Sequence, residues 1–75
     1  MHIELRCFAT LSRFTPANTD AFPLPEGATV SDVLQQLGIP VPEVKIIFIN
    51  GVRHDPDKEL HEGDRLGLFP AVGGG

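Results

Sequence analysis

One amphipathic helix is predicted by the stretch Thr29-Val30-Ser31-Asp32-Val33-Leu34-Gln35-Gln36-Leu37-Gly38. Thr29 is a favourable N-cap, and Asp32 three residues later completes a pattern like a capping box at the positive end of the helix dipole. Gly38 favours a helix end, and the prolines that follow prevent continuation. One apolar stripe runs along the helix at i, i+3, i+4 and i+7, formed by Val30, Val33, Leu34 and Leu37. A helix this short needs packing against another element.

Strands are predicted on the N-terminal side of this helix. The segment His2–Phe8 alternates, with one face made of Ile3, Leu5 and Cys7 and the other of His2, Glu4, Arg6 and Phe8. Ala9–Asp20 is rich in Ser, Thr, Pro and Asn, which predicts an irregular loop. A short strand is expected at Ala21–Leu24, at a sheet edge because of its prolines.

Strands are also predicted after the helix. Val44–Ile49 is a β-rich run that ends at Asn50-Gly51, a strong hairpin signal, so Val52–His54 is the expected return strand. Arg65–Phe69 forms the last strand, with Pro70 ending it. The predicted class is α+β, a mixed four- to five-stranded sheet with one main helix on one face. We expect one domain over residues 1–72 and a flexible glycine tail over residues 73–75.

The composition limits the classes of function. The chain has 75 residues, of which 41% are apolar, and a net charge of −4. Without a basic stripe, nucleic-acid binding is not expected. The longest apolar run, Ile46–Ile49, is too short to span a membrane. No secretion signal is evident, so a cytoplasmic protein is expected.

Conventional catalytic and metal-binding patterns are missing from the sequence. The histidines at positions 2, 54 and 61 lack metal-ligand spacing, so no metal site is expected. Cys7 is predicted to point into the core with Ile3 and Leu5, where a thiol behaves as a small hydrophobe. An acidic segment over residues 55–64 is interpreted as a solvated loop.

The tail Gly73-Gly74-Gly75 is the remaining candidate for chemistry. Glycines are costly to order and contribute no side-chain packing. A chain without Cβ atoms is thin enough to thread a narrow channel in a partner, so that only its terminal carboxylate reaches an active site. The alternative interpretation is a frayed terminus.

Several segments resemble the sulfur-carrier branch of the ubiquitin-like β-grasp family, which includes the small subunit of molybdopterin synthase (MoaD) and the thiamin sulfur carrier (ThiS). The resemblance covers essentially the whole chain. Its motifs are Phe8-Ala9-Thr10-Leu11, Thr29–Leu34, Ile49-Asn50-Gly51, Leu60–Asp64 and Leu68-Phe69-Pro70-Ala71-Val72-Gly73-Gly74-Gly75. The first motif and Phe69-Pro70 favour the molybdopterin carrier, whereas the segment before the helix and the triple glycine suit the thiamin carrier equally well.

The resemblance implies a carrier that is not an enzyme by itself and binds no cofactor. An E1-like adenylyltransferase of the MoeB/ThiF type would use ATP to adenylate the carboxylate of Gly75. A sulfur donor such as a cysteine desulfurase or rhodanese would then convert the adenylate into a thiocarboxylate. The large subunit of molybdopterin synthase would use this sulfur for the molybdenum or tungsten cofactor, or a thiazole synthase would use it for thiamin. The alternatives are a ubiquitin-like modifier conjugated through Gly75 and an interaction domain whose tail is incidental.

Strand alternation also predicts a partner-docking patch. Phe8, Phe48 and Phe69 are expected to face outward on the sheet side away from the helix, with Pro70 beside them. The alternative places Phe8 or Phe48 in the core, because the run Ile46–Ile49 does not reveal its own phase.

Overall fold

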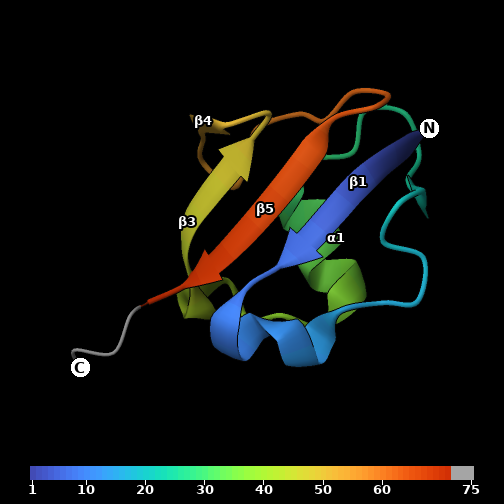
Figure 1. Ribbon diagram of the computed structural model, residues 1–75. Helices are drawn as coiled ribbons and strands as arrows, with labels where there is room; N and C mark the ends of the chain where they lie inside the picture. Colours follow the sequence, from blue (N-terminus) through green and yellow to red (C-terminus); the bar gives the residue numbers. More distant parts are fainter. Residues whose placement is uncertain (72–75) are drawn as a thin grey trace.

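Five strands form one mixed sheet in the order β2-β1-β5-β3-β4 (Figure 1). The computed structural model describes residues 1–71, so the tail predicted over residues 73–75 lies outside the described part. In the sheet, β1 and β5 are parallel, and the other neighbouring strands are antiparallel. The strand bounds are β1 His2–Cys7, β2 Phe22–Pro23, β3 Val44–Ile49, β4 Val52–Arg53 and β5 Arg65–Pro70.

The one α-helix among residues 1–71, α1 (Val30–Leu37), lies behind the sheet in Figure 1 and covers one of its faces. Its predicted capping box is confirmed, because Asp32 N donates to Thr29 Oγ1 at 3.3 Å and Thr29 N donates to Asp32 Oδ2 at 2.9 Å. Gly38 ends the helix with φ of 78°, a left-handed conformation that suits glycine. A mixed five-stranded sheet with one helix packed on it is the β-grasp arrangement that the sequence predicts.

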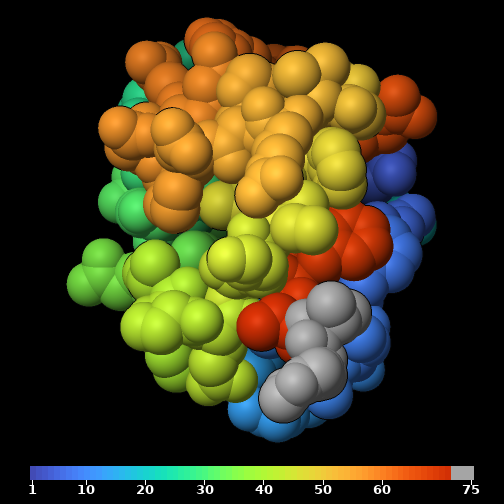
Figure 2. Space-filling view, turned by 90° about the vertical axis from the view of Figure 1, so that its left-hand side faces the viewer, coloured from blue at the N-terminus to red at the C-terminus, as the bar shows by residue number. Residues whose placement is uncertain are grey.

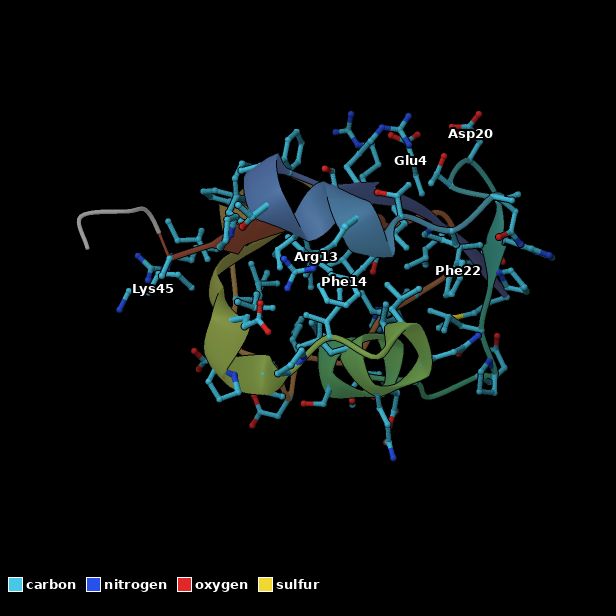
Figure 3. The ribbon with its side chains drawn as sticks, turned by 90° about the horizontal axis from the view of Figure 1, so that it is seen from below. Glu4, Arg13, Phe14, Asp20, Phe22 and Lys45 are labelled. Atoms are coloured by element: carbon cyan, nitrogen blue, oxygen red, sulfur yellow. The ribbon has the colours of Figure 1, made fainter. Side chains whose placement is uncertain are left out.

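The core fills the space between α1 and the inner face of the sheet. Side chains alternate along the strands, and every second one is buried. Figure 3 shows Phe22 between the sheet and the helix, while Glu4 and Asp20 lie on the opposite side. The buried inner-face residues of the three long strands include Ile3, Leu5, Ile47, Ile49, Leu66 and Leu68. Burial of Ile47 and Ile49 fixes the phase of β3, so Phe48 points outward.

Two short 3-10 helices were not predicted. The segment Ala9–Asp20, expected to be an irregular loop, contains η1 (Ala9–Phe14). Ala9 adopts φ of 52° and turns the chain directly after β1, and Leu11 is fully buried. The second helix, η2 (Val41–Glu43), begins after Pro40, and Pro42 fits its first turn because proline fixes a helical φ.

The predicted hairpin is present, with a return strand one residue shorter than expected. Asn50 and Gly51 have φ of 53° and 83°, as a type I′ turn requires, and Ile49 pairs with Val52. Pro70 is the last residue of β5 and pairs with Val44, so the strand ends at Pro70 and not before it. No helix within residues 1–71 has the length and apolar character needed to cross a membrane.

Candidate functional site

Three phenylalanine rings gather on the sheet face opposite α1. Phe8 directly follows β1, Phe48 lies on β3 and Phe69 on β5. The rings of Phe8 and Phe69 are stacked, with centroids 4.3 Å apart and planes 4° apart. Phe48 meets Phe69 edge-on, with centroids 5.7 Å apart. We call these residues the aromatic cluster. Phe8 is 41% exposed, and Phe48 is only partly buried. Neither ring lies in the core, so the alternative interpretation of these two residues is wrong.

A hollow of about 420 Å³ adjoins the aromatic cluster and is broadly open to solvent. Gly67, one of its lining residues, lies on the outer face of β5 between Arg65 and Phe69. The sequence analysis missed this residue, although a glycine inside a strand often marks a place where another group approaches closely. The hollow is lined by Arg6, Phe8, Phe48, Gly51, Arg65, Leu66, Gly67 and Phe69.

Pro70 does not join the aromatic cluster on the surface. It follows Phe69 in β5, and successive residues of a strand point to opposite faces. Pro70 is therefore on the face of Leu66 and Leu68, and it is buried as they are. The predicted grouping of Pro70 with the three rings is wrong for this reason. The other predicted site residues, Gly73, Gly74 and Gly75, lie outside the described residues.

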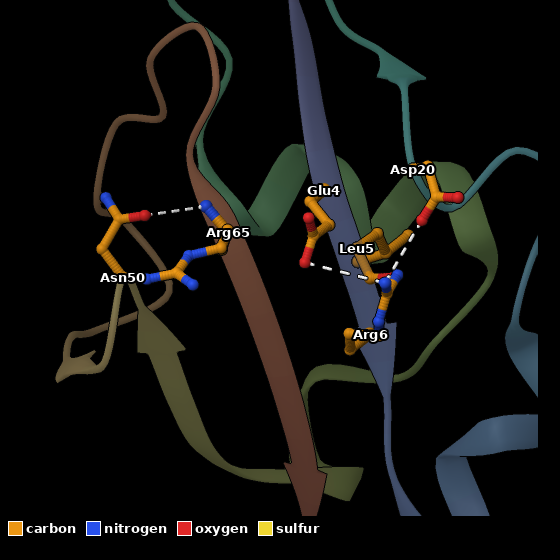
Figure 4. Close-up of polar contacts among 6 residues, drawn as sticks. All are labelled: Glu4, Leu5, Arg6, Asp20, Asn50 and Arg65. Atoms are coloured by element: carbon orange, nitrogen blue, oxygen red, sulfur yellow. Dashed lines mark hydrogen bonds and ion pairs between the residues drawn. The ribbon is translucent and has the colours of Figure 1, made fainter.

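Two arginines flank the hollow from adjacent strands (Figure 4). The guanidinium of Arg6 on β1 lies 3.7 Å from a carboxylate oxygen of Glu4 and 3.2 Å from one of Asp20. On β5, the backbone N–H of Arg65 donates to Asn50 Oδ1 at 3.0 Å, which ties the hairpin to this strand. Both arginine side chains are exposed, and the hollow therefore combines an apolar floor with a cationic rim.

The Cys7 thiol lies on the other face of the sheet, the face of Ile3 and Leu5, and is half-buried against the core. Burial raises the pKa of this thiol, and a hydrogen bond with Thr15 offsets part of the rise. A raised pKa reduces the fraction of reactive thiolate. Within residues 1–71, no three or more His, Cys, Asp or Glu side chains gather in a way that could hold a metal ion.

The aromatic cluster lies near the end of β5, where the described part of the chain stops at residue 71. Figure 2 shows the end of β5 emerging between β3 and the N-terminal part of the chain. A partner that binds the aromatic cluster would thus also contact the point where the described chain ends.

The sequence of this chain matches one known protein family. The model of the ThiS family matches residues 5–75. The chain belongs to the ThiS family. It is thus a small ThiS/MoaD-like protein of the kind that acts as a sulfur carrier or as a ubiquitin-like modifier, and such proteins work with E1-like enzymes and partner subunits. No curated protein sequence matches this ThiS-family chain.

Solved structures give the same classification. SAMP1 from Haloferax volcanii, also called small archaeal modifier protein 1, is 26% identical with a TM-score of 0.73, and the match covers 100% of both chains. A putative molybdopterin converting factor, subunit 1, from Pyrococcus furiosus is 26% identical with a TM-score of 0.72, over 96% of this chain and 99% of that one. The HVO 2177 protein of Haloferax volcanii is 29% identical with a TM-score of 0.76, over 100% of this chain and 87% of that one.

Proposed function

We propose that this ThiS-family protein carries sulfur as a thiocarboxylate on the C-terminal carboxylate of Gly75. An E1-like enzyme joins this carboxylate to the AMP part of ATP and releases pyrophosphate, because a carboxylate oxygen is too poor a leaving group to be displaced directly. Sulfide displaces AMP and forms the carbon–sulfur bond of the thiocarboxylate directly. A persulfide displaces AMP to form an acyl disulfide, and a thiol then cleaves its S–S bond, which releases the thiocarboxylate and leaves a disulfide on the donor side. The protein supplies the acyl group, and its partners supply catalysis, ATP and the sulfur donor.

The observation that carries this proposal is the family match, which extends through Gly75. The position of the aromatic cluster at the end of β5 supports it. Gly75 follows Pro70 by five positions in the sequence, and a fully extended chain of five residues spans at most about 18 Å. An active site that receives Gly75 therefore lies close to the aromatic cluster, and Phe8, Phe48 and Phe69 are the proposed docking residues. Gly73 and Gly74 are proposed to thread the partner's channel.

We assign the sulfur to molybdopterin synthesis. The Pyrococcus furiosus structure that resembles this chain is described as a molybdopterin converting factor subunit, which supports this assignment. The partner is then the large subunit of molybdopterin synthase. In the alternative assignment, the thiocarboxylate supplies sulfur to a thiazole synthase for thiamin. Assays with each of these two partners, using the same thiocarboxylated chain as sulfur source, separate the pathways.

The test is an intact-mass measurement after incubation with the E1-like enzyme of the same organism, ATP and sulfide. Replacement of one oxygen by sulfur adds about 16 mass units, which is the expected result. A matched variant that lacks Gly74 and Gly75 should keep its fold and show no mass change. Absence of the gain in the wild-type chain, with the enzyme demonstrably active on ATP, would contradict the proposal.

A ubiquitin-like modifier is the second candidate, because SAMP1 is described as a modifier protein. Both functions begin with adenylation of Gly75, and they differ in the attacking group. In a modifier, a lysine amine attacks the acyl carbon, displaces AMP from the adenylate or the thiol from a thioester, and forms an isopeptide bond. Lysine-linked conjugates in cell extracts without any thiocarboxylated chain would favour the modifier over the carrier.

A further inference from the structure

The start of β3 contains an irregularity beside the end of β5. Val44 is paired with Pro70. The next pair joins Ile46 to Phe69, so two steps along β3 are matched by one step along β5. Lys45 is therefore the extra residue of a β-bulge, without a partner of its own on β5. Because a bulge bends its strand and re-aims a side chain, Lys45 leaves the regular pattern of the sheet.

The side chain of Lys45 is exposed at the end of the molecule where β5 stops (Figure 3). Its two neighbours differ from it, because Val44 packs against the core and Ile46 is half-buried. Among the ion pairs formed within residues 1–71, none includes Lys45. No carboxylate of the described chain therefore holds the amine of Lys45 in place.

Primary amines are scarce in this chain. They are the side chains of Lys45 and Lys58 and the amino group of Met1. The amino group of Met1 donates to the carbonyl oxygen of Leu24 at 2.8 Å and lies 3.8 Å from a carboxylate oxygen of Glu26. These contacts hold the amino group of Met1, so the two lysines are the remaining nucleophilic amines.

The two lysines lie near opposite ends of α1. The carbonyl oxygen of Lys58 accepts from the backbone N–H of Val30, the first residue of α1, at 3.1 Å. Lys45 follows η2, which begins shortly after the last turn of α1. A helix of eight residues is about 12 Å long. Lys45 is thus the lysine beside the end of β5, and Lys58 lies at the other end of the helix.

The chain after Pro70 is long enough for Gly75 to reach Lys45. The Cα atoms of Lys45 and Pro70 lie within about 9 Å of each other, since directly paired residues are about 5 Å apart and one further residue adds about 3.8 Å. The five residues that follow Pro70 span up to about 18 Å. Three of these five are glycines, which adopt the φ values of tight turns at no steric cost.

We propose that Lys45 captures the activated carboxyl group of Gly75 in the same chain when no sulfur nucleophile is present. This step rests on the proposed function, because it consumes the adenylate that the E1-like enzyme forms. The neutral amine of Lys45 attacks the acyl carbon, and a C–N bond forms. The bond from this carbon to the AMP oxygen breaks, AMP leaves with the electron pair of that bond, and the amine proton passes to water. The product is a ring closed by an isopeptide bond, without the carboxylate that carries sulfur.

Tethering favours this reaction over capture by a second molecule. A group on a short tether reaches an effective concentration on the order of millimolar. Arginine side chains stay protonated and do not attack. Cys7 is half-buried on the inner face of the sheet, and burial raises the pKa of its thiol, which lowers the fraction of thiolate. An enzyme that keeps the C-terminus in a channel prevents ring closure, so the ring marks adenylate released before sulfur arrives.

The first arm of the test needs no E1-like enzyme. The full-length chain is prepared with a small thiol in thioester linkage to Gly75, by cleavage of an intein fusion, and is incubated at mildly alkaline pH. Ring closure releases the thiol and gives a monomer one water lighter than the free acid, at a rate that does not depend on protein concentration. Digestion should yield a branched peptide that joins Lys45 to Gly75.

Two substitutions locate the amine in this first arm. Lys45→Arg keeps the positive charge and should slow ring closure about tenfold or more, as expected for loss of a tethered nucleophile. Lys58→Arg is the matched control, because Lys58 is also exposed, and its ring-closure rate should stay within about twofold of wild type. Equal unfolding midpoints of the two variants show that the difference is chemical.

The second arm uses the E1-like enzyme of the same organism and ATP, with and without sulfide. Without sulfide, the wild type should slowly form the same ring, and sulfide should suppress it by converting the adenylate into the thiocarboxylate. Lys45→Arg should form no ring and should gain sulfur as the wild type does, because Lys45 takes no part in sulfur transfer.

The outcomes separate this inference from the proposed function. A wild-type thioester that only hydrolyses, or that closes equally fast in Lys45→Arg, overturns the inference, while a normal gain of sulfur leaves the proposed function standing. Linked dimers whose rate of formation rises with protein concentration, in place of rings, assign the amine to a second copy and overturn it too. A chain that the enzyme never adenylates contradicts the proposed function, and the inference with it.

Discussion

Phe8 is the residue that best separates binding from folding, because it is the most exposed member of the aromatic cluster. Its ring contributes a stacked contact with Phe69 and covers little of the core. Single residues of this kind decide how a partner is recognised, while the buried residues on the opposite face decide stability. Substitutions on the outer face of β5 are therefore tested by binding measurements, and substitutions on its inner face by unfolding measurements.

Replacing Phe8 with Ala should lower the free energy of unfolding by only about 1 kcal/mol, the value of one aromatic pair. The same change should weaken binding to the E1-like enzyme about tenfold or more, as for an interface anchor. Chemical denaturation and calorimetry measure the two quantities. Val52→Ala is the matched control, since Val52 is 58% exposed and pairs with the inward-facing Ile49. Equal binding losses in both variants would contradict the docking role.

Asn50 stabilises the hairpin by its backbone and by its side chain. It adopts φ of 53°, its Oδ1 accepts from Arg65 N at 3.0 Å, and its Nδ2 donates to Asp64 Oδ1 at 2.9 Å. Asn50→Ala should therefore cost about 1–3 kcal/mol of unfolding free energy. Asn50→Gly, which restores the conformational freedom but not the side chain, should recover part of the loss in the same denaturation assay.

The thiol of Cys7 should react slowly in the folded protein. Its raised pKa means that the folded state holds the proton more tightly than the unfolded state does. The contribution of the protonated Cys7 thiol to the free energy of unfolding is complete at pH values below the pKa of the unfolded state. This contribution is lost as the pH rises through the pKa of the folded state. We expect slow labelling by a thiol reagent at neutral pH, rapid labelling in urea, and a stability decrease in alkaline solution that Cys7→Ala lacks. Rapid labelling of the folded protein at neutral pH would contradict this account.

Among the elements, α1 depends most visibly on local sequence signals. The helix has eight residues, and a helix this short is marginal without caps and packing. Its N-terminus is held by the reciprocal bonds of Thr29 and Asp32, and its C-terminus by Gly38. These signals are strictly local, which explains why the sequence alone predicts both ends of this helix.

Removal of the cap tests this explanation. Thr29→Ala should lower the unfolding free energy by about 1 kcal/mol, within a usual range of roughly 0.5–2, because Asp32 N loses its acceptor. Thr29→Ser keeps an acceptor oxygen and should be close to wild type. Both changes are measured by thermal or urea unfolding, and an equal loss in the two variants would show that packing of the threonine methyl group, and not the cap, is responsible.

At the scale of the whole molecule, alternation along β1 and β5 predicts the two faces of the sheet and the outward position of Phe8 and Phe69. The phase of β3 was not predictable, because Ile46–Ile49 is apolar throughout and only tertiary packing selects which residues are buried. The helix η1 was missed for a similar reason, since Leu11 and Phe14 turn inward only once the chain has closed over the core. Pro70 follows Phe69 in the sequence, yet strand alternation places its side chain on the opposite, inner face, where it is buried.

The central claim is that sulfur is carried on Gly75, and fragment-ion mass spectrometry of the chain treated with the E1-like enzyme, ATP and sulfide tests it most directly. The account predicts a gain of about 16 mass units confined to fragments that contain Gly75. A gain of about 32 mass units on fragments that contain Cys7, the mark of a persulfide, would contradict it. An unmodified Gly75 in a chain that still supports cofactor synthesis would contradict it equally.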